Sequence, residues 1–252
     1  MKKRALTGIQ PTGTPHIGNY VGALKPQLDL AANTDFTVNM FLADYHAMNN
    51  SDARKNLGQL TVELAATLLA LGFDPKGCTF YRQSDVPETF ELASFLTNFT
   101  PKGLMNRAHA YRASVQANHE NGQTGDDEDI GINTGLYNYP ILMSADILLF
   151  DTDLVPVGRD QRQHIEFARD IAGSINAVYG EGTCKLPEGI TSETTMEIPG
   201  LDGRKMSKSY GNVLSMFAEA SDIEKTCKRI KTDSKQPEEP KDKDNLVYIL
   251  YR

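Results

Sequence analysis

The stretch that decides the fold is Gly8-Ile9-Gln10-Pro11-Thr12-Gly13-Thr14-Pro15-His16-Ile17-Gly18-Asn19-Tyr20, which follows the short run Arg4-Ala5-Leu6-Thr7. The run predicts a buried first strand. Thr14 as the N-cap and Pro15 at the first helical position predict a helix that starts directly after the glycine-bounded turn. At the positive end of that helix, His16 and Asn19 lie on one face as neutral hydrogen-bond donors, which is typical of an anion site such as one for a triphosphate. An ordinary capped βα turn has the same features, so this stretch alone leaves both interpretations open.

Strand and helix patterns alternate along the rest of the chain. Residues 36–44 read as a buried strand and 78–81 as a short strand, and helical spacing covers 52–71, 87–98, 137–150 and 213–230. This alternation predicts an α/β fold with a parallel sheet. Parallel strands present polar side chains at their carboxyl ends, so Asp44-Tyr45-His46, after the second strand, is expected at a site.

Composition narrows the class of protein. With 252 residues, 40% of them hydrophobic, the chain can bury one large core. No run is long enough to span a bilayer, and the start has no signal-peptide pattern. Three widely spaced cysteines form neither a disulfide framework nor a zinc pattern, so we expect a cytoplasmic protein. A net charge of −7 disfavours indiscriminate nucleic-acid binding but permits a local basic patch that meets one folded RNA.

Asp146 is the single carboxylate of the apolar stretch 137–150. An unpaired buried carboxylate is expensive, so a donor partner is expected. Residue type alone favours an intramolecular partner, either an arginine or backbone N–H groups, over an N–H group of a ligand. The acidic cluster Asp126, Asp127 and Asp129 lies in the polar stretch 116–130, and we expect it to face solvent in a surface loop rather than bind a metal.

A second motif, Lys205-Met206-Ser207-Lys208-Ser209, follows a glycine-containing loop. Lysines that alternate with small hydroxyl residues suit a flexible clamp on phosphate oxygens, although a solvated lysine pair is the ordinary alternative. Together with His16-Ile17-Gly18-Asn19, this motif resembles the paired HIGH-type and KMSKS-type signature of class I aminoacyl-tRNA synthetases. Asn19 stands in place of the second histidine.

Two further stretches narrow the resemblance: Met143-Ser144-Ala145-Asp146-Ile147-Leu148-Leu149 and Val155-Pro156-Val157-Gly158-Arg159-Asp160-Gln161-Arg162-Gln163-His164. In collinear order over the whole chain, these motifs resemble the bacterial-type tryptophanyl-tRNA synthetase family. The resemblance implies a Rossmann-like parallel sheet in a catalytic domain, 1–204, with a helical dimer-interface insertion at about 99–150. It also implies a KMSKS loop and the start of a helical anticodon-binding domain, cut short, at 205–252.

The resemblance implies a reaction as well. In this family ATP, with Mg²⁺, and L-tryptophan form tryptophanyl-adenylate and pyrophosphate, and the tryptophanyl group then passes to tRNA(Trp). We therefore expect a homodimer without a membrane partner. Most of the anticodon-reading portion is absent, which leaves tRNA binding by this chain open but not adenylate formation. The catalytic residues that the resemblance implies are His16, Asn19, Lys205 and Lys208.

The resemblance also implies two sets of binding residues and no metal ligands. The ATP-binding set is Gln10, Pro11, Thr12, Gly18, Asn19, Gly158, Arg159, Asp160, Ile198, Lys205, Met206, Ser207, Lys208 and Ser209. The tryptophan-binding set is Asp146, Met143, Tyr139, Gln161 and His46. In that set Asp146 accepts a hydrogen bond from the indole N–H, which reverses the preference stated above for an intramolecular partner.

Three rival interpretations remain. A tyrosyl-tRNA synthetase has the same fold and dimer, but the Asp146 arrangement argues against it. A small-molecule nucleotidyltransferase shares the histidine-containing turn but seldom the full lysine motif. A non-catalytic relative that binds an amino acid or RNA would not need the phosphate clamp that Lys205 and Lys208 imply.

Overall fold

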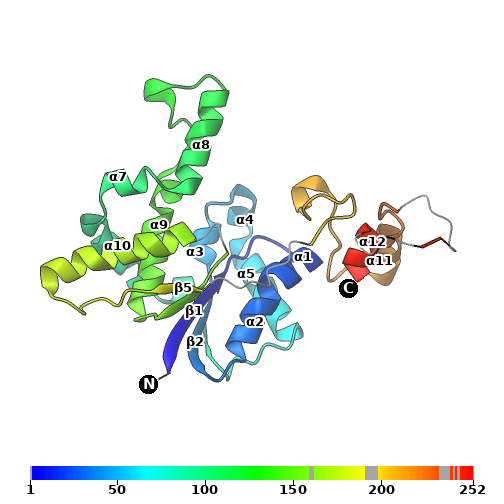
Figure 1. Ribbon diagram of the computed structural model, residues 1–252, viewed down its shortest axis with the longest axis horizontal. Helices are drawn as coiled ribbons and strands as arrows, with labels where there is room; N and C mark the ends of the chain where they lie inside the picture. The colour runs from blue at the N-terminus through cyan, green and yellow to red at the C-terminus, as the bar shows by residue number, and fades with distance from the viewer. Residues whose placement is uncertain are drawn as a thin grey trace. The chain divides into compact units, whose positions relative to one another are not determined.

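The computed structural model describes residues 2–158, 162–190, 198–232, 239–240, 242 and 245–251. By its internal contacts the chain forms two compact units, which are described one at a time (Figure 1). Unit 1 comprises Met1–Thr12 and Ala31–Ser192, and unit 2 comprises Gly13–Leu30 and Glu193–Arg252. The division into domains at residue 204 stays a prediction. Within the described ranges, no helix is long and apolar enough to cross a membrane.

Unit 1 contains a five-stranded parallel sheet in the order β3-β2-β1-β4-β5. Its strands are β1 (Lys3–Ile9), β2 (Phe36–Leu42), β3 (Thr79–Arg82), β4 (Leu154–Pro156) and β5 (Glu188–Ile190). From β1 the chain adds β2 and β3 on one side of the sheet and then β4 and β5 on the other. Doubly wound sheets have this arrangement, and their ligands bind outside the carboxyl ends of the strands. The predicted α/β class and parallel sheet are confirmed.

The core of unit 1 forms where the central strands meet two long helices. Side chains from β1, β2, α9 (Thr134–Leu149) and α10 (Arg162–Tyr179) pack in one cluster, which includes Leu6, Phe41, Ile147 and Ile165. A Cβ at Gly8 would lie 2.5 Å from Cζ of Phe41. Glycine at this position therefore leaves room for the Phe41 ring.

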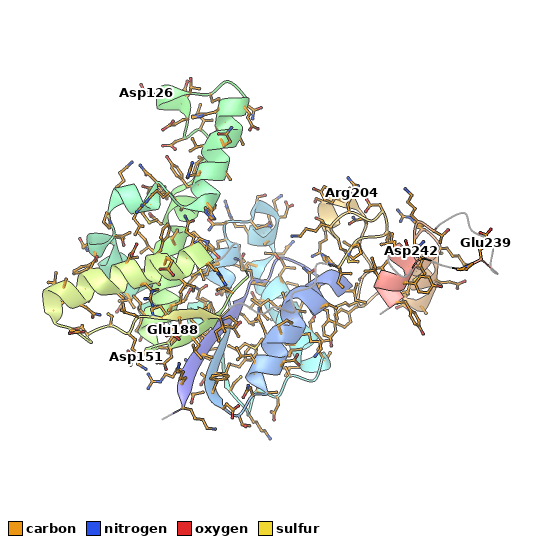
Figure 2. All side chains as sticks on the ribbon, in the orientation of Figure 1. Asp126, Asp151, Glu188, Arg204, Glu239 and Asp242 are labelled. Atoms are coloured by element: carbon orange, nitrogen blue, oxygen red, sulfur yellow. The ribbon has the colours of Figure 1, made fainter. Side chains whose placement is uncertain are left out.

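The other helices of unit 1 are α3 (Asp44–Ala47), α4 (Ser51–Lys55), α5 (Leu57–Ala70), α6 (Glu88–Leu96), α7 (Lys102–Met105) and α8 (His109–Glu120). The single helix predicted over 52–71 is wrong, because the chain leaves helical geometry at Asn56, where φ is −131°. The loop predicted over 116–130 is wrong at its start, since α8 continues through Glu120. Asp126, labelled in Figure 2 beyond the end of α8, is exposed, as are Asp127 and Asp129.

Unit 2 begins with helical turns of three kinds in succession. They are α1 (Ile17–Asn19), the π-helical turn Tyr20–Leu24 and α2 (Lys25–Ala31), whose last residue belongs to unit 1. The predicted helix start is wrong by two residues, because His16 rather than Thr14 is the N-cap. Later in unit 2 come the 3₁₀ turn Lys208–Tyr210, α11 (Ala220–Cys227) and α12 (Leu246–Tyr251), so the helix predicted over 213–230 is confined to its middle.

Candidate active site

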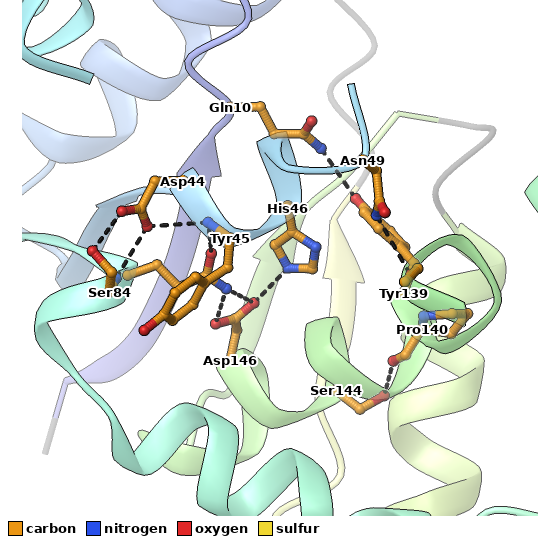
Figure 3. Close-up of polar contacts among 12 residues, drawn as sticks. Gln10, Asp44, Tyr45, His46, Asn49, Ser84, Tyr139, Pro140, Ser144 and Asp146 are labelled. Atoms are coloured by element: carbon orange, nitrogen blue, oxygen red, sulfur yellow. Dashed lines mark hydrogen bonds and ion pairs between the residues drawn. The ribbon is translucent and has the colours of Figure 1, made fainter. Parts of the chain in front are cut away.

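The first cluster of candidate residues, in unit 1, surrounds the carboxylate of Asp146 on α9 (Figure 3). Nε2 of His46, on α3, lies 2.8 Å from Oδ2. Nε2 of Gln83, directly after β3, donates to Oδ1 at 2.8 Å and to Oδ2 at 3.0 Å. The exposed fractions are 2% for Asp146, 4% for His46 and 0% for Gln83. These three residues come from three elements and form one buried polar network.

The partners of Asp146 differ from both intramolecular types that residue chemistry favoured. They are a histidine and a glutamine rather than an arginine or backbone N–H groups. A carboxylate has about four lone-pair directions, and three are occupied here. One direction on Oδ1 is left for a further donor. Nδ1 of His46 is also buried without a hydrogen-bond partner among the described residues, so the network has capacity for a ligand.

Tyr139 and Gln10 lie beside this network. Nε2 of Gln10 donates to the hydroxyl of Tyr139 at 3.4 Å, and the rings of Tyr139 and His46 have centroids 4.5 Å apart. Burial and the negative charge of Asp146 raise the pKa of the Tyr139 hydroxyl, so it stays protonated and able to donate at neutral pH. Met143 packs against the core cluster defined above.

Asp44 fixes the helix that carries His46. Its carboxylate accepts from the backbone N–H groups of Tyr45 and Ser84, at 3.1 and 3.0 Å, and from the Ser84 hydroxyl. These bonds join α3 to the segment after β3, from which Gln83 also comes. The predicted placement of Asp44-Tyr45-His46 at the carboxyl end of β2 is confirmed.

Three more described residues of the predicted ATP-binding set belong to unit 1. Pro11 is fully buried, and the backbone N–H of Thr12 donates to the carbonyl of Gln10 at 3.0 Å. Gly158 follows β4 by two residues. Arg159, Asp160 and Gln161 lie outside the described residues, so their predicted roles stay predictions.

The second cluster, in unit 2, begins at the N-terminus of α1. Nδ1 of His16 accepts from the backbone N–H of Asn19 at 3.2 Å, and Oδ1 of Asn19 accepts from the backbone N–H of His16 at 3.1 Å. This reciprocal capping box puts the imidazole hydrogen on Nε2 of the neutral ring. Burial, and to a lesser extent the charge of Lys208, lower the pKa of His16. The predicted pair of neutral donors is therefore present, with His16 as the cap itself.

The lysine motif lies against the same turn. A Cβ at Gly13, where φ is +115°, would lie 2.9 Å from Nζ of Lys208, so the lysine reaches the turn through the space that glycine leaves. A Cβ at Gly18 would lie 3.1 Å from the His16 ring and 3.3 Å from Cβ of Met206. Burial lowers the pKa of Lys208. Gly13, His16, Gly18, Met206 and Lys208 are thus brought together.

Asn212, which sequence analysis missed, holds the backbone of this motif. Its Oδ1 accepts from the N–H of Ser207 at 2.8 Å, and its Nδ2 donates to the carbonyl of Lys205 at 3.1 Å and to Asp202 at 2.8 Å. Asn212 is 3% exposed. A Cβ at Gly200 would lie 2.2 Å from the Asn212 amide nitrogen, so glycine there makes room for it. The only sequence signal was an ordinary turn at Gly211-Asn212.

The remaining motif residues flank this arrangement. The carbonyl of Ile198 accepts from the N–H of Met206 at 3.3 Å, and the Ser207 and Ser209 hydroxyls are 2.8 Å apart. Among the residues that the structure describes, no group of three or more His, Cys, Asp or Glu side chains is placed to hold a metal ion.

Comparison with known proteins assigns the family. Residues 2–250 match the sequence model of a group of class I aminoacyl-tRNA synthetases, described as tRNA synthetases class I (W and Y). The chain belongs to this family.

Curated relatives and solved structures agree with this assignment. The chain is 52% identical to the tryptophan–tRNA ligase of Bordetella pertussis and 53% identical to that of Neisseria meningitidis, in both cases over its whole length. It spans 56% of the Bordetella protein and 74% of the Neisseria protein. The crystal structure of tryptophanyl-tRNA synthetase from Campylobacter jejuni, complexed with ADP and tryptophan, matches 98% of the chain with a TM-score of 0.84 and 43% identity, over 73% of its own length.

The lowered pKa of His16 predicts a pH dependence of stability. The folded state binds fewer protons at this residue than the unfolded chain, so its contribution is fully present above about pH 6.5, the unfolded value, and is lost as pH falls through the folded-state pKa. His16→Asn retains a side chain that caps helices but cannot titrate. Between pH 7.5 and 5, the urea-unfolding midpoint of the wild type should fall further than that of the variant. Parallel curves would contradict this assignment of the imidazole.

Proposed function

We propose that this chain carries the amino-acid-activating part of a tryptophan–tRNA ligase. It would form tryptophanyl-adenylate and pyrophosphate from L-tryptophan and ATP, and the whole protein would then transfer the tryptophanyl group to tRNA(Trp). The observation that carries the proposal is the buried Asp146 carboxylate with one open acceptor direction, beside the orphaned Nδ1 of His46. The ADP and tryptophan held by the Campylobacter relative support the same substrates.

In the proposed reaction the amino-acid site recognises the indole ring. Asp146 would accept from the indole N–H, and Met143 and His46 would line the pocket. Tyr139 and Gln161 would hold the α-ammonium or carboxylate group. A ring without an N–H, such as that of phenylalanine, would leave a buried charge without its last partner, a penalty that gives large discrimination.

ATP would be held by residues of both motifs. Gln10, Pro11 and Thr12 would line its site, with Gly18 and Asn19 on the helix and Gly158, Arg159 and Asp160 at the adenosine. Asp160 would accept from the ribose hydroxyls. Ile198 would pack on adenine, and the motif Lys205-Met206-Ser207-Lys208-Ser209 would close on the phosphates. Mg²⁺ would enter with ATP as part of that substrate, bound to phosphate oxygens.

The chemistry requires no protein nucleophile. A carboxylate oxygen of tryptophan attacks the α-phosphorus of ATP, a new O–P bond forms, and the bond to the β-phosphate breaks with the electron pair leaving on pyrophosphate. The protein would align the two substrates and stabilise the charge that develops on the leaving group. Nε2–H of His16, the Asn19 amide, Lys205 and Lys208 would supply that stabilisation.

The partners of the whole protein form part of the proposal. A homodimer and tRNA(Trp) are expected from the family, and the relatives' additional length would supply the rest of the tRNA-binding surface. Activation of the amino acid does not depend on tRNA in this scheme, so it can be tested on the chain itself.

The test is amino-acid-dependent exchange of pyrophosphate into ATP, with tryptophan and tyrosine run in parallel. We expect exchange with tryptophan and at least about 10⁴-fold less with tyrosine, the discrimination typical of sites built around a buried hydrogen bond. Because the chain contains ten tyrosines and no tryptophan, fluorescence excited at long wavelength reports bound tryptophan independently. Exchange with tyrosine would favour a tyrosyl-tRNA synthetase. Tryptophan binding without exchange would favour a non-catalytic relative.

A further inference from the structure

Gln83 is a fully buried polar residue beside the candidate tryptophan site, and neither motif includes it. It opens the 3₁₀ turn Gln83–Asp85 after β3 and is 0% exposed. A glutamine in such a place loses all its bonds to water, so each of its polar atoms needs a partner inside the protein.

The hydrogen bonds of Gln83 fix which way its amide points. Its Oε1 accepts from the backbone N–H of Tyr45 at 3.2 Å, and a backbone N–H can only donate. The oxygen must therefore face Tyr45, and the NH₂ group must face Asp146, where it bonds to both carboxylate oxygens. The reversed amide would put two donors against each other at Tyr45.

This arrangement restricts the orientation of Asp146. The carboxylate is held at two points, by Nε2 of Gln83 against both oxygens and by Nε2 of His46 against Oδ2. His46 alone, which contacts only Oδ2, would leave the carboxylate free to turn. With Gln83 present, the open direction on Oδ1 keeps one orientation.

We infer that Gln83 is a specificity-determining positioning residue, which holds the Asp146 carboxylate oriented as the acceptor for an indole N–H. The inference rests on the proposed function. It assigns part of the discrimination between an indole and an isosteric ring without N–H to a residue that does not touch the ligand. Through Tyr45, Gln83 also ties this acceptor to α3, the helix that carries His46.

The test measures the Kd of two ligands for the wild type and for Gln83→Met, which keeps the volume of the side chain but cannot donate. The ligands are L-tryptophan and L-3-(benzothien-3-yl)alanine, in which sulfur replaces the indole N–H. For Gln83→Met the Kd of tryptophan should rise about 10- to 30-fold, the lower part of the range for loss of hydrogen bonds to a charged group. The Kd of the sulfur analogue should change less than about threefold, so the ratio of the analogue's Kd to that of tryptophan should fall. Isothermal calorimetry reports both.

A matched control is Gln27→Met, the same substitution at a half-buried glutamine on α2 whose Oε1 has no hydrogen-bond partner among the described residues. Both Kd values should remain at the wild-type level. If Gln83→Met does not fold, Gln83→Asn replaces it, because it keeps an amide but withdraws the donor by one C–C bond, about 1.5 Å. The ratio should fall in this variant too.

The outcomes separate this inference from the proposed function. Equal losses for both ligands in a folded Gln83 variant, or an unchanged ratio, would overturn the positioning role and leave the proposed function intact. A wild type that binds tryptophan no better than the sulfur analogue would overturn the inference together with the proposed role of Asp146, whereas failure of tryptophan-dependent exchange would overturn the proposed function. A collapse of the ratio confined to the Gln83 variants would support the inference.

Discussion

Replacing Asp146 with asparagine should lower kcat/KM for tryptophan in pyrophosphate exchange by about 10²- to 10³-fold. Both carboxylate oxygens now accept from Gln83, and Oδ2 also bonds His46. An amide presents one oxygen and one NH₂ group, so in either orientation its NH₂ faces a donor. The variant therefore loses the negative charge that would hold the indole N–H and gains a donor–donor conflict.

The loss in Asp146→Asn should fall mainly on KM for tryptophan, with KM for ATP nearly constant. Asp153→Asn is the control, since that carboxylate pairs with the Arg4 backbone and Lys185, contacts that belong to neither candidate cluster. Its exchange activity should match the wild type. An Asp146→Asn variant with unchanged KM for tryptophan would show that the indole is read elsewhere.

Lys208→Ala should lower kcat of exchange about 10²- to 10³-fold, equivalent to about 3–4 kcal/mol, by analogy with the loss of one oxyanion donor. Nζ of Lys208 lies at the Gly13 turn close to the capping histidine, where a triphosphate would meet the N-terminus of α1. The charge on pyrophosphate grows as the bond to the α-phosphorus breaks. The positive charge of Lys208 therefore stabilises the transition state more than it stabilises bound ATP.

The affinity of Lys208→Ala for tryptophan, measured by fluorescence, should stay within about threefold of the wild type, because the contacts that hold Asp146 come from His46 and Gln83. Lys228→Ala is the control, since Lys228 is an exposed residue of the same unit that pairs with Glu224. Lys228→Ala should exchange normally. Retention of kcat in Lys208→Ala would remove Lys208 from the pyrophosphate site.

The sequence predicted the elements that carry strong local patterns. β2 is a run of mostly buried residues and β1 has a buried centre, Ala5-Leu6-Thr7, and both were predicted because apolar runs mark central strands. β5 was missed, since Glu188-Gly189-Ile190 is exposed and belongs to the sheet only through its pairing with β4. The start of α1 was misplaced because Thr14 and Pro15 are favourable by residue type, whereas the observed cap depends on the reciprocal bonds of His16 and Asn19.

For the candidate site, the motifs indicated which side chains gather but not what supports them. The grouping of His46 and Asp146 was expected from the family resemblance, and in the structure Nε2 of His46 lies 2.8 Å from Oδ2 of Asp146. Gln83 could not be predicted, because it is 63 residues from Asp146 in sequence and its role depends on the meeting of α9 with the end of β3. Asn212 is near its motif, but only the fold shows that its side chain faces inward.

Asn212 holds the backbone of the lysine motif and does so without contacting its charged side-chain atoms. Its contacts reach the N–H of Ser207 and the carbonyl of Lys205, atoms that every residue other than proline provides. Gly200 and Asn212 thus determine the path of the backbone, whereas the lysine side chains supply the charge that this backbone carries. Mutation can therefore explore new chemistry at positions 205 and 208 on a constant frame, while a change at Gly200 or Asn212 would alter all the motif's side chains at once.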